Sequence, residues 1–298
     1  MSQPPAPARD GVYEHRYHAG NVADVFKHIA LVAWLDRLRA HGKSLHYVET
    51  HAGAGRYHLG PQGEWREGIG RLLEAEDIDQ APMAVRRYLE LLDARPSRKG
   101  VRYLGSPLLA ARALQGTDAG ATLFETHAES AVHLRTAMTP YEAVSVSETD
   151  GVAALAQGFR SLKNDLVTVL CDPPWTAKAE WTQVPDALIA AAKHRPSSSF
   201  LLWYPVKSLT RPNAMMERIK AQGVGAVVVE LSTAPTLVSR GRLVGSGLVM
   251  VRPPDGVVDE LAGVCAWLGP RLAHAPGAWS MRVTSWVPPA DGRARAQL

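Results

Sequence analysis

Four consecutive residues, Asp172-Pro173-Pro174-Trp175, have the chemistry needed to bind the exocyclic amine of a nucleobase. They follow an apolar run at residues 166–171 that predicts a buried parallel strand, and open α/β sheets bind ligands at the carboxyl ends of such strands. The Asp172 carboxylate and the Pro173 carbonyl can accept the two N–H bonds of the amine, while the Trp175 ring stacks on the base. The structural alternative is a strand that ends in a proline-terminated loop, with Trp175 filling the core.

Three other segments predict a nucleoside-like cofactor. A loop with Gly53 and Gly55 follows an expected strand, and glycines there let the chain turn tightly and approach a ligand closely. Glu125 ends another expected strand, where an acid typically accepts both hydroxyls of a ribose. Asp150, with the backbone of Gly151, follows a third strand and is placed to meet an adenine edge. In this order, the segments predict an S-adenosylmethionine-dependent amino-methyltransferase.

The chemistry would centre on Asp172. The N6 amine of adenine is a poor nucleophile because its lone pair is delocalised into the ring. Hydrogen bonds to Asp172 and to the Pro173 carbonyl favour a more pyramidal amine and aim it at the sulfonium methyl group. Asp172 also stabilises the positive charge that develops on the nitrogen. Stacking on Trp175 is typically worth about 1–3 kcal/mol. We therefore predict catalytic roles for Asp172, Pro173 and Trp175.

The chain also resembles a known family over nearly its whole length. The matching segments are Tyr17-His-Ala-Gly-Asn-Val-Ala-Asp-Val-Phe-Lys-His28, Thr50-His-Ala-Gly-Ala-Gly-Arg-Tyr57, Gly105-Ser-Pro107, Leu202-Trp-Tyr-Pro205, Gly245-Ser-Gly247 and Thr284-Ser-Trp286. These are similar to the RlmJ family, bacterial methyltransferases of the N6 amine of one adenine in 23S ribosomal RNA. The family pattern usually ends Asp-Pro-Pro-Tyr, and Trp175 stands here for the tyrosine, so this chain has no hydroxyl at that position.

The resemblance implies further site residues. It places His28, His51 and Ser106 beside the cofactor, although a histidine in a helical core would give His28 the same pattern.

Tyr13 precedes the first helix and is a candidate gate over the substrate. The residues that we expect to contact the substrate are Tyr13, Lys27, Pro174, Arg95, Arg98 and Lys99.

The sequence predicts a Rossmann-like methyltransferase fold with a small helical insertion. Seven strands are expected, in a mostly parallel sheet whose last strand is antiparallel, at residues 45–49, 121–125, 143–147, 166–171, 199–204, 226–231 and 246–251. An amphipathic helix is expected from Val22 to Ala40.

An insertion is predicted because Glu125 lies 70 residues after Gly55, whereas about 20 is usual. The expected organisation is a flexible lead at 1–11, a methyltransferase domain at 12–59 and 105–298, and a helical subdomain at 60–104 that helps to position RNA. Ser106 is predicted to cap the helix that follows, with Pro107 at its first position.

Composition limits the other classes of protein. The 298 residues are 46% hydrophobic without a membrane-length apolar run, and the start of the chain does not resemble a secretion signal. Two cysteines predict no disulfide scaffold and fit a reducing cytoplasm; Cys171 is more typical of a buried filler than of a nucleophile. No cysteine accompanies the histidines and no H-E-x-x-H pattern occurs, so the sequence does not indicate a metal site. The net charge of +4 is compatible with a polyanionic partner, and we expect a monomer acting on free 23S rRNA before subunit assembly.

Other functions stay open at this point. A DNA adenine-N6 methyltransferase would use the same four segments, but about 45 inserted residues at 60–104 are few for reading base edges. Methylation of a protein glutamine is chemically similar at Asp172. A binding protein that keeps the fold without catalysis would have no need of Asp172, Glu125 or the glycine loop.

Overall fold

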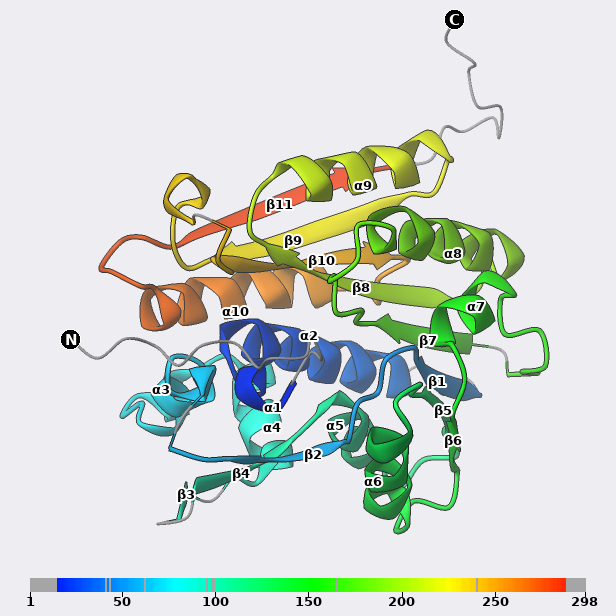
Figure 1. The fold of residues 1–298 in the computed structure, drawn as a ribbon, viewed down its shortest axis with the longest axis horizontal. Helices are drawn as coiled ribbons and strands as arrows, with labels where there is room; N and C mark the ends of the chain where they lie inside the picture. Colours follow the sequence, from blue (N-terminus) through cyan, green and yellow to red (C-terminus); the bar gives the residue numbers. More distant parts are fainter. Residues whose placement is uncertain are drawn as a thin grey trace, which may run out of the picture.

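The main sheet of the protein has eight strands in the order β11-β9-β10-β8-β7-β1-β5-β6 (Figure 1). The computed structural model describes residues 15–40, 42, 44–61, 63–94, 96–97, 100–164, 166–239 and 241–287. The strands of the main sheet are β1 (Leu45–Glu49), β5 (Gly120–Phe124), β6 (Val144–Ser147), β7 (Leu166–Cys171), β8 (Ser199–Val206), β9 (Ala226–Ser232), β10 (Gly245–Val251) and β11 (Ser280–Trp286).

The pairing confirms the predicted fold class and adds one strand. Strands β6, β5, β1, β7 and β8 are mutually parallel, and β10 runs antiparallel between β8 and β9 as expected. The expected count of seven was wrong, because β11 pairs antiparallel with the outer edge of β9. Most of the β11 side chains are exposed, so this strand lacks the apolar pattern by which the others were found.

Helices cover both faces of the sheet (Figure 1). One face packs against α7, α8 and α9, and the other against α2, α5 and α10. Strand β7 is buried along its whole length, and its alternate side chains enter two separate apolar clusters, Leu170 on one face and Val169 with Cys171 on the other. The helices are α1 (His15–His18), α2 (Val22–Arg39), α3 (Ile69–Leu73), α4 (Met83–Leu92), α5 (Ser106–Ala113), α6 (Ala128–Met138), α7 (Gly151–Ala156), α8 (Glu180–His194), α9 (Thr210–Ala221) and α10 (Val257–Leu272).

The segment inserted after β1 is not purely helical. It holds α3, α4 and the short 3₁₀ turns η1 (Glu64–Arg66) and η2 (Ile78–Gln80), but also two strands, β3 (Pro96–Ser97) and β4 (Gly100–Leu104). These strands form a second sheet with β2 (Arg56–Leu59), in the order β2-β4-β3. Helix α4 packs on α2 and α5, which joins this segment to the main core.

The start of α5 corrects another expectation. Gly105, not Ser106, is the N-cap residue, and it makes no side-chain capping bond. Pro107 is therefore the second residue of the helix rather than the first, a position that still needs no intrahelical N–H bond.

Among the described residues, no helix combines the length and apolarity that a membrane crossing requires.

Candidate active site

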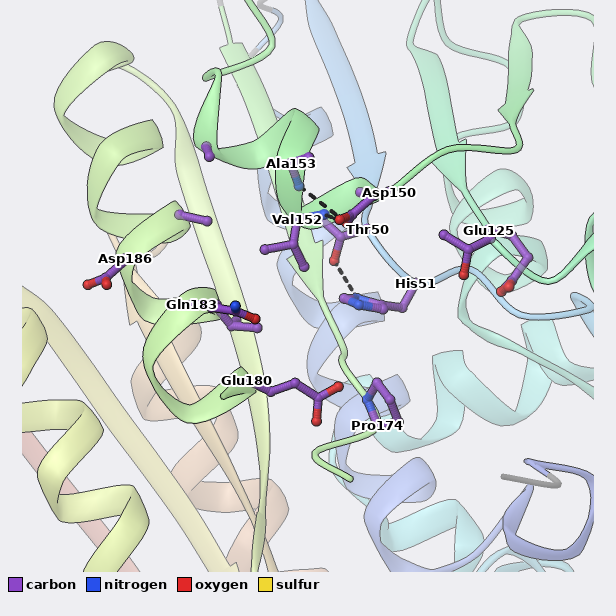
Figure 2. Close-up of a pocket in the computed structure, with 15 residues that line it drawn as sticks. Thr50, His51, Glu125, Asp150, Val152, Ala153, Pro174, Glu180, Gln183 and Asp186 are labelled. Atoms are coloured by element: carbon purple, nitrogen blue, oxygen red, sulfur yellow. Dashed lines mark hydrogen bonds between the residues drawn. The ribbon is translucent and has the colours of Figure 1, made fainter. Parts of the chain in front are cut away.

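The carboxyl ends of β1, β5, β6 and β7 meet at one edge of the sheet, and a cavity of about 750 Å³ lies there (Figure 2). Its size is that of a small-molecule site. The walls come from the segments after β1, β5 and β6, from Pro174 after β7, and from the first turns of α8 (Figure 2). The lining residues are Thr50, His51, Glu125, Thr126, Asp150, Gly151, Val152, Ala153, Ala156, Pro174, Glu180, Gln183, Val184, Asp186 and Ala187.

The wall of this cavity is acidic. Four of the lining residues are carboxylic acids, namely Glu125, Asp150, Glu180 and Asp186, and none is lysine or arginine. His51 does not add a positive charge, because burial lowers its pKa by more than the nearby Asp172, Glu125 and Asp150 raise it. The cavity therefore favours a ligand that carries positive charge, and it disfavours one that depends on phosphate groups.

The glycine loop holds Glu125 at the cavity. The Gly53 N–H donates to Glu125 Oε2 at 2.8 Å, and the His127 N–H donates to Oε1 at 2.7 Å. Gly53 has a φ of 62°, and a Cβ on it would lie 2.4 Å from the hydroxyl oxygen of Tyr57. A side chain at position 53 would thus displace the loop that orients the carboxylate.

Asp150 and Gly151 form the opposite wall. Asp150 caps α7, because its Oδ1 accepts from the N–H groups of Val152 at 2.8 Å and Ala153 at 3.2 Å (Figure 2). Gly151 packs so closely that a Cβ on it would lie 2.2 Å from the carbonyl oxygen of Thr50. Here glycine is required for close packing of two loops, and the capping bonds fix the Asp150 carboxylate.

Asp172 is held in an ion-paired chain with two residues of α2. The Lys27 ammonium group contacts Asp172 Oδ2 and, at 2.8 Å, Asp24 Oδ1. Burial alone lowers the pKa of Lys27, but the charges and hydrogen bonds of Asp172 and Asp24 outweigh it, and the pKa is raised above its ordinary value. Lys27 was expected to contact substrate; its side chain is instead buried behind Asp172, with the ammonium 5.5 Å from the Trp203 ring centre.

Trp175 lies in the core of the structure. It is 5% exposed, its ring centre is 4.3 Å from that of Trp181, and its Nε1–H donates to the Trp203 carbonyl at 3.1 Å. It also has a φ of 54°, which is an uncommon conformation for a residue other than glycine. This is the packing arrangement left open by the sequence, and base stacking by Trp175 stays a prediction. Pro173 is buried, whereas Pro174 is exposed at the cavity.

Sequence reasoning missed one further acid at the carboxyl end of a strand, namely Glu49 at the end of β1. Its side chain is fully buried and accepts hydrogen bonds from the hydroxyls of Tyr47, at 2.8 Å, and Ser106. Burial raises the pKa of Glu49 to about 8; the two hydrogen bonds lower it in part, while the charge of Asp172 raises it further. The signal for finding Glu49 was present, since an acid at a strand's carboxyl end had already identified Glu125 and Asp172.

His28 is positioned by the inserted segment. Its Nδ1 lies 2.8 Å from the hydroxyl of Tyr103 on β4, and that hydroxyl is 3.2 Å from the hydroxyl of Tyr88 on α4. All three side chains are buried, and the rings of His28 and Tyr103 stack at 5.8 Å. The tyrosine pair therefore fixes the orientation of the His28 ring.

The predicted cofactor residues fall into three groups. Four of them, namely His51, Glu125, Asp150 and Gly151, line the cavity. Gly53 acts on the cavity through Glu125. His28 and Ser106 are buried and bonded to Tyr103 and Glu49, away from the lining.

Several residues that were predicted to contact the substrate lie outside the described part of the chain. Tyr13, Arg95, Arg98 and Lys99 lie outside the described residues, as does the lead at 1–11. The residues that line the cavity but were not anticipated include Thr50, Val152, Glu180 and Gln183. The described part of the chain holds no cluster of three or more metal-ligating side chains.

The strand order and the ligand-binding edge define a Rossmann-like methyltransferase. The chain matches the family model for "Ribosomal RNA large subunit methyltransferase D, RlmJ" over residues 42–287. It therefore belongs to the RlmJ family. Two curated relatives carry the name "Ribosomal RNA large subunit methyltransferase J". The Haemophilus influenzae protein is 31% identical over 93% of this chain and 99% of its own, and the Escherichia coli protein is 30% identical over the same shares.

A solved structure has the same overall fold. The crystal structure of protein LPL1258 from Legionella pneumophila is 28% identical, with a TM-score of 0.81 over 90% of this chain and 98% of that one. The fold described above is thus shared along almost the full length of both chains.

Proposed function

We propose that this chain transfers a methyl group from S-adenosylmethionine to the N6 amine of an adenine in 23S ribosomal RNA. The proposal rests mainly on the position of Asp172. Its carboxylate is ion-paired with Lys27 at the carboxyl end of β7, two residues before Pro174, which lines an acidic cavity of cofactor size. The rRNA substrate is supported by the curated relatives, which are named large-subunit rRNA methyltransferases. We further propose that free rRNA is the substrate, since an adenine must be unpaired to enter the site.

The cavity fits S-adenosylmethionine on the chemistry of its walls. The cofactor carries a sulfonium and an ammonium charge, and four carboxylates face the space without a cationic competitor. Glu125, aligned by the backbone of Gly53 and His127, suits the two ribose hydroxyls. Asp150 and Gly151 suit the adenine edge. When bound, S-adenosylmethionine would supply the electrophilic methyl carbon.

The chain's own residues would prepare the adenine amine. Asp172 and the Pro173 carbonyl accept its N–H bonds and aim the nitrogen lone pair at the methyl carbon, which contributes through orientation. As the nitrogen becomes positive, the fixed carboxylate stabilises it without having to reorganise. The new N–C bond would form as the S–C bond of the cofactor breaks, and the nitrogen would then release one proton to solvent to give the neutral N6-methyl product.

Lys27 would keep Asp172 in its reactive position. The ammonium group uses Asp172 Oδ2, so the other carboxylate oxygen, Oδ1, is the one that we assign to the amine. Asp24 holds the far side of Lys27 and also accepts from the Gly20 N–H at 2.9 Å, which links the pair to the turn before α2. The amine acceptor is thereby connected to a rigid helix rather than to a loop alone.

The test is a methyl-transfer assay with tritiated S-adenosylmethionine. The wild-type protein would be offered in vitro transcribed 23S rRNA and, separately, unmethylated DNA, and the labelled nucleosides identified after digestion. We expect N6-methyladenosine from RNA alone. Label only in DNA would overturn the substrate, and label in neither polymer would overturn the activity.

A further inference from the structure

One stretch of the carboxyl edge differs from the cofactor cavity in charge. Three loops lie there: β7–α8, β8–α9 and β9–β10. Beyond Asp172 and before Glu180, the first has no acid, and neither do residues 206–216 or 231–244. In the described part of these loops and in the first turn of α9, the exposed cations are Lys178, Lys207, Arg211 and Arg242, which we call the basic rim.

The β8–α9 and β9–β10 loops form one continuous surface. The Ser239 hydroxyl donates to the Lys207 carbonyl at 2.7 Å, and the Val244 N–H donates to the Val206 carbonyl at 2.9 Å. Ser239 is buried in this contact. Figure 1 shows the two loops at the same end of the sheet, and β8 lies directly beside β7, the strand that ends at Asp172. The basic rim is therefore adjacent to the amine acceptor.

This surface also carries an exposed apolar side chain. Leu237 lies in the 3₁₀ turn η3 (Thr236–Val238) and is 97% exposed, the highest fraction among the exposed large apolar residues of the described chain. Leu209, on the joined β8–α9 loop, is 42% exposed. Both side chains leave apolar area in contact with water on these joined loops, and a bound partner could cover that area.

We propose that the basic rim binds the phosphates that flank the target adenine, and that Leu237 packs into the base stack that the adenine leaves. This inference rests on the proposed function, and it assigns the RNA to one particular surface. Lysine and arginine side chains without intervening acids suit a polyanion. An adenine must leave its stack to reach Asp172, and proteins that unstack bases often insert an apolar side chain at that step.

The first test removes charge from the rim. The variant Lys207→Ala/Arg211→Ala/Arg242→Ala is compared with Arg160→Ala/Lys163→Ala/Lys220→Ala, whose three exposed cations lie on the α7–β7 loop and near the end of α9, away from the carboxyl edge. Binding to transcribed 23S rRNA is measured across a salt series. We expect the rim variant to lose at least about tenfold in affinity and the slope of log K against log salt to flatten by about 2–3. The control should match wild type.

The second test concerns Leu237. Leu237→Ala is compared with Val287→Ala, which truncates another exposed apolar residue, just after β11 and beside the start of β9, away from the carboxyl edge. In single-turnover methylation at saturating rRNA, we expect Leu237→Ala to slow transfer about tenfold while the Kd for rRNA changes less than about threefold. Unchanged rates would overturn the role of Leu237.

The outcomes separate this inference from the proposed function. If the wild type methylates rRNA but the rim and control variants bind alike, the surface is wrong and the function stands. If the wild type binds rRNA with a rim-dependent salt slope yet transfers no label, the surface stands and the activity is wrong. If the wild type neither binds nor methylates rRNA, both are overturned.

Discussion

The carboxyl edge of the sheet has two halves with opposite charge. On the side of β1, β5 and β6, a cavity is lined by four carboxylic acids and no lysine or arginine. On the side of β8, β9 and β10, the loops carry exposed lysines and arginines and no acid between residues 231 and 244. Asp172 lies between them at the end of β7. Under the functions proposed above, this division would let one edge attract a cationic cofactor and a polyanionic substrate without either competing for the other's site.

The largest effect is expected from changing Asp172, which lies at the boundary between the two halves of the edge. Asp172→Asn keeps the size of the side chain but offers the amine one acceptor fewer and no negative charge. We expect methyl transfer to fall by about 10³-fold or more, because the variant loses both orientation and charge stabilisation. S-adenosylmethionine and rRNA affinities, measured by calorimetry and filter binding, should stay within a few fold. A large loss of cofactor affinity would assign Asp172 to the acidic half instead.

The Lys27 ion pairs should dominate the stability of this boundary. Lys27→Met leaves Asp24 and Asp172 buried without their shared cation, and removing one partner of a buried pair typically costs about 3–5 kcal/mol. Urea unfolding would measure the loss. The matched variant Asp24→Asn/Lys27→Met removes one of the two stranded charges and should recover part of the stability. Equal stability of the single and double variants would contradict a charge-based origin.

The buried acid Glu49 should make the acidic half sensitive to pH. Its folded pKa of about 8 lies above the ordinary value of 4.5, so the native state binds the proton more tightly than the unfolded chain. Its contribution to stability is therefore complete below about pH 4.5 and is lost as the pH rises through about 8.

Glu49→Gln tests this, because the amide cannot ionise. Between pH 5.5 and 7.5, the stability advantage of wild type over the variant should shrink by up to about 2.7 kcal/mol, at about 1.4 kcal/mol per pKa unit. Urea unfolding of both proteins across this range measures the difference. An advantage that stays constant across this range would mean that Glu49 is already ionised in the native state.

The parts of the molecule that depend on local pattern were predicted from the sequence. The seven apolar strands and α2 were placed within a few residues, because buried strands and helices have distinctive apolar periods. The eighth strand, β11, was missed because its side chains are mostly exposed. The cap of α5 was placed one residue late, because the Ser106 hydroxyl bonds to Glu49 and not to the helix N-terminus.

The parts that depend on distant contacts were not predicted. Lys27 and Asp172 are 145 residues apart in sequence, and no local pattern couples them. The same applies to the Tyr103 contact with His28, 75 residues away, which turns a residue of the inserted segment into a support for the core. For Trp175 the motif left base stacking and core packing both open, and only the distant contacts of its ring with Trp181 and β8 show that it is packed in the core.

The smallest effect is expected from a substitution that is confined to the acidic half of the edge. Glu125→Gln keeps the shape of the side chain but weakens its bonds with the Gly53 and His127 N–H groups and with a ribose. Hydrogen bonds to a charged group contribute about 1.5–3 kcal/mol, so cofactor affinity should fall about 10- to 100-fold. Affinity for rRNA and its salt dependence should match wild type, since the basic rim is untouched. If rRNA affinity fell in parallel, the two halves of the edge would not be independent, and the proposed division of the site by charge would be wrong.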